Sequence, residues 1–220
     1  MLPPTLTIGC GSHGGNSVSE NVSCKHLLNY KNVTVRRENT LWFKTPPKVY
    51  FNKGCLEEGI KELFRFKRAF IITDKVLVDL GYTDRITKPL KDKGVELTLF
   101  SEVVPDPDLA CCNKCLAQIK AFKPDLFIAL GGGSAMDLMK MVRMMYEHEG
   151  VDFDGLAQRF MDIRKRIYEF PELLDMTKCK TYAVCIPTTS GTGSEVTPFA
   201  VITDNVKVVK YPLADYQLMP

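Results

Sequence analysis

Short apolar segments alternate with longer amphipathic segments through most of the chain. The apolar runs at residues 69–74, 95–100, 126–130 and 182–186 have the length and the β-branched or aromatic content of buried strands. The segments beside them, near residues 56–64, 75–93, 109–122 and 136–145, repeat apolar residues at the spacing of a helix with one buried face. Such alternation predicts an α/β fold, with a parallel sheet flanked by helices on both faces. Val49-Tyr50-Phe51 is predicted as a further short strand.

The first 40 residues have a different pattern. Glycines, serines and asparagines dominate residues 9–23 without an amphipathic period, and Val33-Thr34-Val35 could form one short strand. We interpret residues 1–40 as a linker or tail that depends on another surface for order. Residues 41–220, which begin with an apolar and aromatic group at Leu41-Trp42-Phe43, are predicted to form the folded domain.

The run from Leu126 to Leu130 is followed by three glycines and then by a helical segment, with Ser134 at the expected N-cap position. A strand, a glycine turn and a helix N-terminus form an anion site, since free amides and the helix dipole favour negative charge. The alternative is a tight turn without a ligand. Because three consecutive glycines cost backbone entropy, we favour ligand binding. The spacing is not the G-x-G-x-x-G of the Rossmann fingerprint.

A second strand-end loop follows the run that ends at Ile186. Residues 187–195 read Pro-Thr-Thr-Ser-Gly-Thr-Gly-Ser-Glu, so hydroxyl groups and glycines crowd one turn. Hydroxyls and backbone amides can hold a pyrophosphate or a ribose without adding charge. The alternative is an ordinary hydroxylated loop. Two such loops on neighbouring strand ends make a shared ligand the better hypothesis.

Asp74 ends an apolar run and therefore is expected at the same edge of the sheet, where α/β proteins bind their ligands. A carboxylate there can accept both hydroxyls of an adenosine ribose and would repel a 2′-phosphate. In the Rossmann fingerprint the acid follows the glycine loop, whereas Asp74 precedes it, which indicates a related but distinct dinucleotide fold. Capping the next helix is the alternative role, and the two roles can coexist.

Composition narrows the class of protein. The 220 residues are 45% hydrophobic, and the net charge of +3 is too small to indicate a nucleic-acid partner. We expect no membrane partner, because no apolar run approaches the length of a span and the N-terminus does not resemble a signal peptide. A cytoplasmic location follows, with the eight cysteines as reduced thiols.

No metal site is predicted. Cys112 and Cys115 form a C-x-x-C, but no second ligand pair lies at a suitable spacing, so packing on the apolar face of a helix is favoured. The three histidines are far apart in the sequence. The basic stretch from Arg159 to Tyr168 is interpreted as a solvated helix face or a subunit contact rather than as an RNA site.

Two motifs in order carry a family resemblance. Gly131-Gly132-Gly133-Ser134-x-x-Asp137-x-x-Lys140, followed by the Thr-rich run 187–197, resembles the iron-dependent (group III) alcohol dehydrogenases. Residues 160–168 and 210–216 are more specifically similar to the alcohol dehydrogenase half of the bifunctional aldehyde–alcohol dehydrogenases of fermentative microbes. Residues 5–39 resemble the end of their aldehyde dehydrogenase half and the connector.

The resemblance implies a Rossmann-like nucleotide-binding domain of the dehydroquinate synthase-like type. It also implies NAD as cofactor, an alcohol or aldehyde as substrate, and a homo-oligomer or filament. Carried over by position, the NAD contacts fall on twelve residues: Asp74, Asp106, Gly132, Gly133, Ser134, Met136, Asp137, Thr188, Thr189, Thr192, Val201 and Lys210.

The family holds Fe²⁺ with one Asp and three His of a following helical domain, so we expect those ligands beyond Pro220 and the acyl-transfer cysteine before Met1. Three functions remain open at this point. The chain could be the NAD-binding part of an enzyme that interconverts acetaldehyde and ethanol by hydride transfer, but inactive alone. It could be a catalytically incomplete assembly module, or it could serve another substrate, as in the related dehydroquinate synthase and glycerol dehydrogenase folds.

Overall fold

The structure is a computed structural model that describes residues 45–148, 150, 180–205 and 209–220. The interpretations of residues 1–40, 41–43 and 159–168 lie outside the described residues. The elements in chain order are α1 (Cys55–Leu63), β1 (Arg68–Ile72), α2 (Lys75–Asp79), α3 (Asp84–Asp92), β2 (Glu96–Phe100), α4 (Leu109–Phe122), β3 (Leu126–Gly131), α5 (Gly133–Glu147), β4 (Tyr182–Pro187), β5 (Phe199–Asp204) and β6 (Val209–Ala214), with short 3₁₀ turns η3 (Ser194–Val196) and η4 (Tyr216–Leu218).

Four strands form a parallel sheet in the order β2-β1-β3-β4. Ile71 pairs with Leu99 on one side and with Ile128 on the other, and Gly131 at the end of β3 pairs with Pro187 at the end of β4. The glycine turn (residues 131–133) and the Thr-rich loop (residues 188–193) therefore leave the sheet side by side. The predicted parallel α/β sheet is confirmed.

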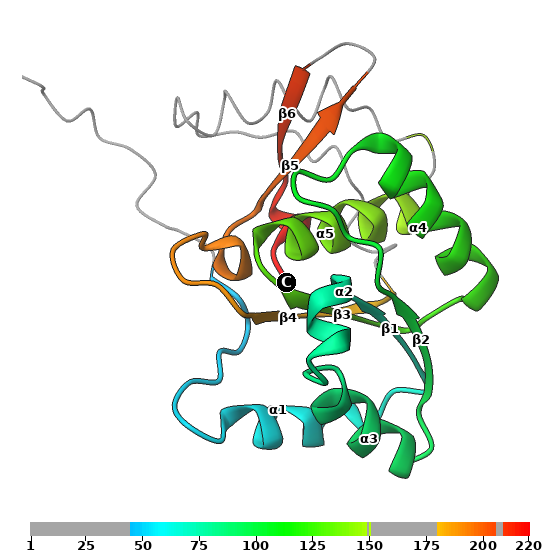
Figure 1. The fold of residues 1–220 in the computed structure, drawn as a ribbon, viewed down its shortest axis with the longest axis vertical. Coiled ribbons are helices and arrows are strands. Elements are labelled where there is room, and N and C mark those ends of the chain that lie inside the picture. The colour runs from blue at the N-terminus through cyan, green and yellow to red at the C-terminus, as the bar shows by residue number, and fades with distance from the viewer. Residues whose placement is uncertain (1–44, 149, 151–179, 206–208) are drawn as a thin grey trace, which may run out of the picture. The chain divides into compact units, whose positions relative to one another are not determined.

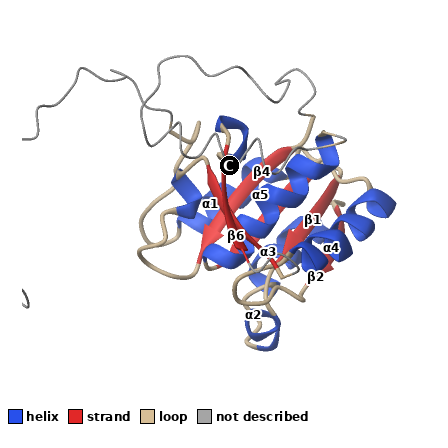
Figure 2. Cartoon of the chain, turned by 90° about the horizontal axis from the view of Figure 1, so that it is seen from above, coloured by secondary structure: helices blue, strands red, loops and turns tan. Residues whose placement is uncertain are grey.

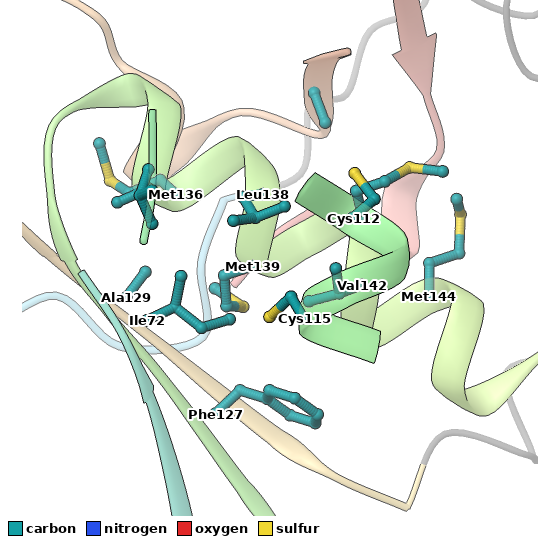
Figure 3. Packing of buried hydrophobic residues seen from close by; sticks show 14 of the residues in the cluster. Ile72, Cys112, Cys115, Phe127, Ala129, Met136, Leu138, Met139, Val142 and Met144 are labelled. Atoms are coloured by element: carbon teal, nitrogen blue, oxygen red, sulfur yellow. The ribbon is translucent and has the colours of Figure 1, made fainter. Parts of the chain in front are cut away.

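Helices cover both faces of this sheet because successive strand residues point in opposite directions. Ala69, Ile71 and Ile128 pack with residues of α1 and α3, whereas Phe70 and Phe127 pack with residues of α4 and α5. Figure 1 shows α1 and α3 on one side of the sheet and α4 and α5 on the other. The second face holds the sulfur-rich part of the core, in which side chains of α4 and α5 meet those of β1 and β3 (Figure 3).

A separate antiparallel hairpin, β5–β6, follows the Thr-rich loop (Figure 2). It lies against α5 and α4, since Ala200, Ile202 and Leu213 are fully buried in the same cluster as α5. The amide of Thr203 donates to the carbonyl of Pro107 at 3.0 Å, which joins the hairpin to the turn before α4. The hairpin thus lies near the end of the sheet from which the glycine turn and the Thr-rich loop leave.

The prediction of one helix from Lys75 to Lys93 is wrong. α2 ends at Asp79, Gly81 adopts a φ of +75°, and α3 starts at Asp84. Left-handed glycine is a common way to end a helix, so Gly81 divides the segment in two.

The predicted strand Val49-Tyr50-Phe51 is also wrong, because these residues have no strand partner among the described residues. Tyr50 instead packs on α1, with its ring within 3.5 Å of the position that a Cβ would take at Gly59. The Tyr50 hydroxyl and the Lys48 ammonium both donate to Glu62 of α1, at 2.5 and 2.6 Å. Side-chain contacts with a helix here replace the pairing that the apolar pattern suggested.

Candidate nucleotide-binding site

The β3–α5 turn is tightly built. Gly131 has a φ of +154°, and a Cβ at this position would lie 2.8 Å from the Cβ of Ala135, so only glycine fits. α5 starts at Gly133, and the N-cap residue is Gly132, which has no side chain to accept from the first amides. The prediction that Ser134 is the N-cap is therefore wrong, because the helix begins one residue before it. The N-terminus of α5 therefore has no side-chain cap.

The Thr-rich loop, residues 188–193, packs directly on this turn. A Cβ at Gly132 would lie 3.2 Å from Cγ2 and Oγ1 of Thr189, and one at Gly133 would lie 3.3 Å from Cγ2 of Thr192. The amide of Thr188 donates to the carbonyl of Gly131 at 2.9 Å. The two strand-end loops thus form one continuous surface with exposed hydroxyl residues at its rim.

This contact changes the interpretation of the glycine run. The absence of side chains at Gly132 and Gly133 is already accounted for by the threonines of the chain itself. Three glycines are therefore no direct measure of a close ligand. The site rests instead on the uncapped N-terminus of α5 and on the groups arranged around it.

Asp74 lies beside the glycine turn. Its Oδ1 accepts from the amide of Leu77 at 2.9 Å and so caps α2, which confirms the capping role. Its Oδ2 lies 3.7 Å from the position of a Cβ at Gly131. One oxygen is therefore used by the helix while the other faces the turn, as the two coexisting roles require.

The turn before α4 reaches the same helix N-terminus. Asp106 has a φ of +53°, and its amide donates to Oγ of Ser134 at 3.3 Å. Its carboxylate pairs with the ammonium of Lys210 on β6 at 2.8 Å, with both side chains more than half exposed. Three segments that are far apart in the sequence thereby meet at the start of α5.

Three further residues predicted to contact NAD, Met136, Asp137 and Val201, differ in how much of each is open to a ligand. The side chain of Met136 is fully buried in the core, so only its backbone remains for a ligand. Oδ2 of Asp137 accepts from the amide of Val201 at 3.0 Å, while its Oδ1 is buried without a hydrogen-bond partner. Burial raises the pKa of the Asp137 carboxyl, although the Val201 amide and the Lys140 ammonium oppose this shift. Val201 itself is 40% exposed.

Lys140 is part of the glycine motif, but the sequence pattern assigns it no role. It is only 2% exposed, and its ammonium donates to the carbonyls of Thr197 and Phe199, each at 2.8 Å. Burial lowers the pKa of Lys140, against the raising effect of Asp137, Cys185 and Glu195. The available signal was a lysine within the methionine-rich face of the helix, three residues after Asp137.

The C-x-x-C cysteines belong to the core. Cys112 and Cys115 are fully buried among residues of α4 and α5, as Figure 3 shows, so the packing interpretation is confirmed. Within the described ranges, no group of three or more His, Cys, Asp or Glu side chains is placed to hold a metal ion. These residues therefore do not fit an iron centre. No helix in the same ranges is long and apolar enough to span a membrane.

The sequence profile of the iron-containing alcohol dehydrogenases matches residues 46–220. The chain belongs to this family. Solved structures agree with the assignment at the level of the fold. A 1,3-propanediol oxidoreductase aligns with a TM-score of 0.69 and 26% identity over 84% of this chain and 44% of its own. An iron-containing alcohol dehydrogenase of Thermococcus thioreducens aligns with a TM-score of 0.68 and 25% identity, over 81% of this chain and 45% of its own.

Curated members of the family are similar over the whole chain. The bifunctional aldehyde-alcohol dehydrogenase of Escherichia coli K12 is 53% identical over 100% of this chain and 24% of its own length. The aldehyde-alcohol dehydrogenase of Clostridium acetobutylicum is 49% identical, again over 100% of this chain and 25% of its own length. The chain thus spans about a quarter of the length of these relatives.

Proposed function

We propose that the chain is the NAD-binding part of an alcohol dehydrogenase. The observation that carries this proposal is the convergence at the start of α5. The uncapped helix N-terminus, the exposed Thr-rich loop and the free oxygen of Asp74 surround one turn in a member of a family of alcohol dehydrogenases. An uncapped N-terminus attracts a pyrophosphate, and a carboxylate nearby suits the hydroxyls of a ribose.

The roles of the residues follow from their positions. The amides of Gly133 and Ser134 would hold the pyrophosphate, and the hydroxyls of Thr188, Thr189 and Thr192 would add neutral donors. The backbone of Gly132 and Met136 completes this turn. Asp74 would bind the adenosine ribose and disfavour NADP(H). Lys210 and Asp106, already paired across the site, would contact the cofactor from the hairpin side, together with Asp137 and Val201.

The bound cofactor would supply hydride transfer: NADH would donate a hydride to an aldehyde, and NAD would accept one from an alcohol. The residues of this chain bind and orient it, and they exclude water on the side covered by the Thr-rich loop. Because the described residues do not fit an iron centre, we derive no step through the metal. We further propose an alcohol or aldehyde substrate, a homo-oligomer or filament, a cytoplasmic location and a division of the chain at residue 40.

The proposal is tested by placing a negative charge at the start of α5. Ser134 is the second residue of α5, and Ala110 is the second residue of α4, so Ser134→Glu and Ala110→Glu are matched variants. An acidic side chain in the first turn favours a helix by about 0.3–1 kcal/mol, so neither variant should lose much thermal stability. Only Ser134→Glu should repel the pyrophosphate.

We expect calorimetric titration of the 220-residue chain to show NADH binding for the unmodified chain and for Ala110→Glu. The affinity of Ser134→Glu should be at least about tenfold weaker, which corresponds to about 1.4 kcal/mol. Equal weakening in both variants, or none in Ser134→Glu, would refute the site. A folded chain that binds no NADH would instead favour the assembly module.

A further inference from the structure

The outer edge of β5 is covered by side chains of a helix instead of by another strand. Along a strand, the N–H and C=O groups of alternate residues point to the same side. The carbonyl of Pro198 accepts from Asp215 on the β6 side. The backbone groups of residues 197, 199, 201 and 203 therefore face the other way, toward α5 and the turn before α4.

One outward group of each of these four residues has a partner, and the four bonds follow one another along the strand. Lys140 donates to the carbonyls of Thr197 and Phe199, both at 2.8 Å. Asp137 accepts from the amide of Val201 at 3.0 Å, and the carbonyl of Pro107 accepts from Thr203 at 3.0 Å. Asp137 and Lys140, which lie one turn apart on α5, thus bond to backbone groups that a neighbouring strand would otherwise pair with.

The first position of this row of bonds, Thr197, is connected to the Thr-rich loop through η3. Thr197 directly follows η3, and η3 directly follows the segment that lies on Gly132 and Gly133. At its other end the same loop is held to the end of β3, through the bond from the Thr188 amide to the Gly131 carbonyl. Thr189 and Thr192 have exposed side chains, so their placement depends on these two anchors.

We propose that Lys140 is a positioning residue for the nucleotide site, which holds Thr197 and Phe199 so that Thr189 and Thr192 lie over the glycine turn. This inference rests on the proposed NAD site for its functional part. A buried ammonium is an expensive group, and methionine would fill the same space between Met139 and Met141. Its two charge-assisted bonds to the backbone account for the presence of a lysine.

The test compares Lys140→Met and Lys140→Gln with the unmodified chain. Lys120→Met, which removes an exposed lysine of α4, is the control. Methionine keeps the volume without donors, and glutamine keeps two donors without the charge. The first readout is hydrogen exchange of the 220-residue chain without nucleotide. The second is NADH affinity.

We expect amides of residues 188–201 to exchange about tenfold faster or more in Lys140→Met, with Lys140→Gln intermediate. Amides of β1 and β3 should keep their rates, and Lys120→Met should match the unmodified chain. NADH affinity should fall in the same order, by about tenfold in Lys140→Met, because fewer molecules hold the competent loop.

Unchanged exchange at residues 188–201 in Lys140→Met would overturn the proposal, as would uniform acceleration over the whole chain. If Lys140→Met does not fold, Lys140→Gln decides by the same comparison of loop and sheet. If the unmodified chain binds no NADH, the proposed function fails, whereas hydrogen exchange still decides the role of Lys140.

Discussion

Replacing Asp74 separates its two roles. Oδ1 caps α2 through the amide of Leu77 at 2.9 Å, while Oδ2 faces the glycine turn. Asparagine is as good an N-cap as aspartate, whereas alanine cannot accept the bond. Asp74→Asn should therefore keep the cap and lose only the charge. Asp74→Ala should lose both.

The magnitudes follow from these contacts. Loss of an N-cap costs about 1 kcal/mol, which lowers the melting temperature of a domain of this size by about 2–4 °C. We expect that shift for Asp74→Ala and almost none for Asp74→Asn. A hydrogen bond to a charged group contributes about 1.5–3 kcal/mol, so either variant should bind NADH about ten- to hundredfold more weakly.

The assay pairs thermal unfolding without nucleotide with titrations of NADH and NADPH. Because the carboxylate repels a 2′-phosphate, the preference for NADH over NADPH should shrink in Asp74→Asn. An equal loss of melting temperature in both variants would refute the capping argument. An unchanged ratio of NADH to NADPH affinity in Asp74→Asn would remove Asp74 from the ribose site.

Three further predictions concern packing and charge. Gly131→Ala should lower the free energy of unfolding in urea by about 1–3 kcal/mol more than Gly94→Ala, since a Cβ at Gly131 meets Ala135 at 2.8 Å and one at Gly94 meets nothing within 4 Å; equal losses would contradict the close contact. Burial raises the pKa of Cys112 and of Cys185 to about 12, so both thiols stay protonated at pH 8. Peptide mapping should therefore show that iodoacetamide labels them slowly in the folded chain and rapidly in the urea-unfolded control. Rapid labelling of the folded chain would contradict this prediction. Lys210→Met breaks an exposed ion pair with Asp106 and should change stability by less than about 1 kcal/mol while it weakens NADH binding; unchanged affinity would remove Lys210 from the site.

The apolar pattern was sufficient for the sheet, because buried parallel strands such as β3 are continuous hydrophobic runs that few other structures explain. The same pattern gave a wrong prediction for the short apolar segment 49–51, which packs on a helix and has no strand partner among the described residues. Tyr50 packs on α1 and bonds to its Glu62, and no rule of periodicity reveals this contact between the ring and the helix. Gly81 was visible in the sequence, but a single glycine does not show whether it bends or ends a helix.

The candidate site was predictable in its parts and less so in its connections. Strand-end loops carry ligand groups in α/β folds, so Asp74 and the Thr-rich loop could be placed at one edge of the sheet. The N-cap was misplaced by two residues, because the cap position depends on where the backbone turns into α5. The role of Lys140 depends on carbonyls almost sixty residues away, and spacing along one helix carries no information about them.

The contact between the threonines and the glycines also constrains how this protein can change over evolution. Gly132 faces Thr189 and Gly133 faces Thr192 at distances that leave no room for a methyl group without a shift. A larger residue in one loop therefore requires a smaller one in the other, so each pair should vary together among homologues. In a double-mutant cycle, Gly132→Ala combined with Thr189→Ser should be less damaging than the sum of the two single changes.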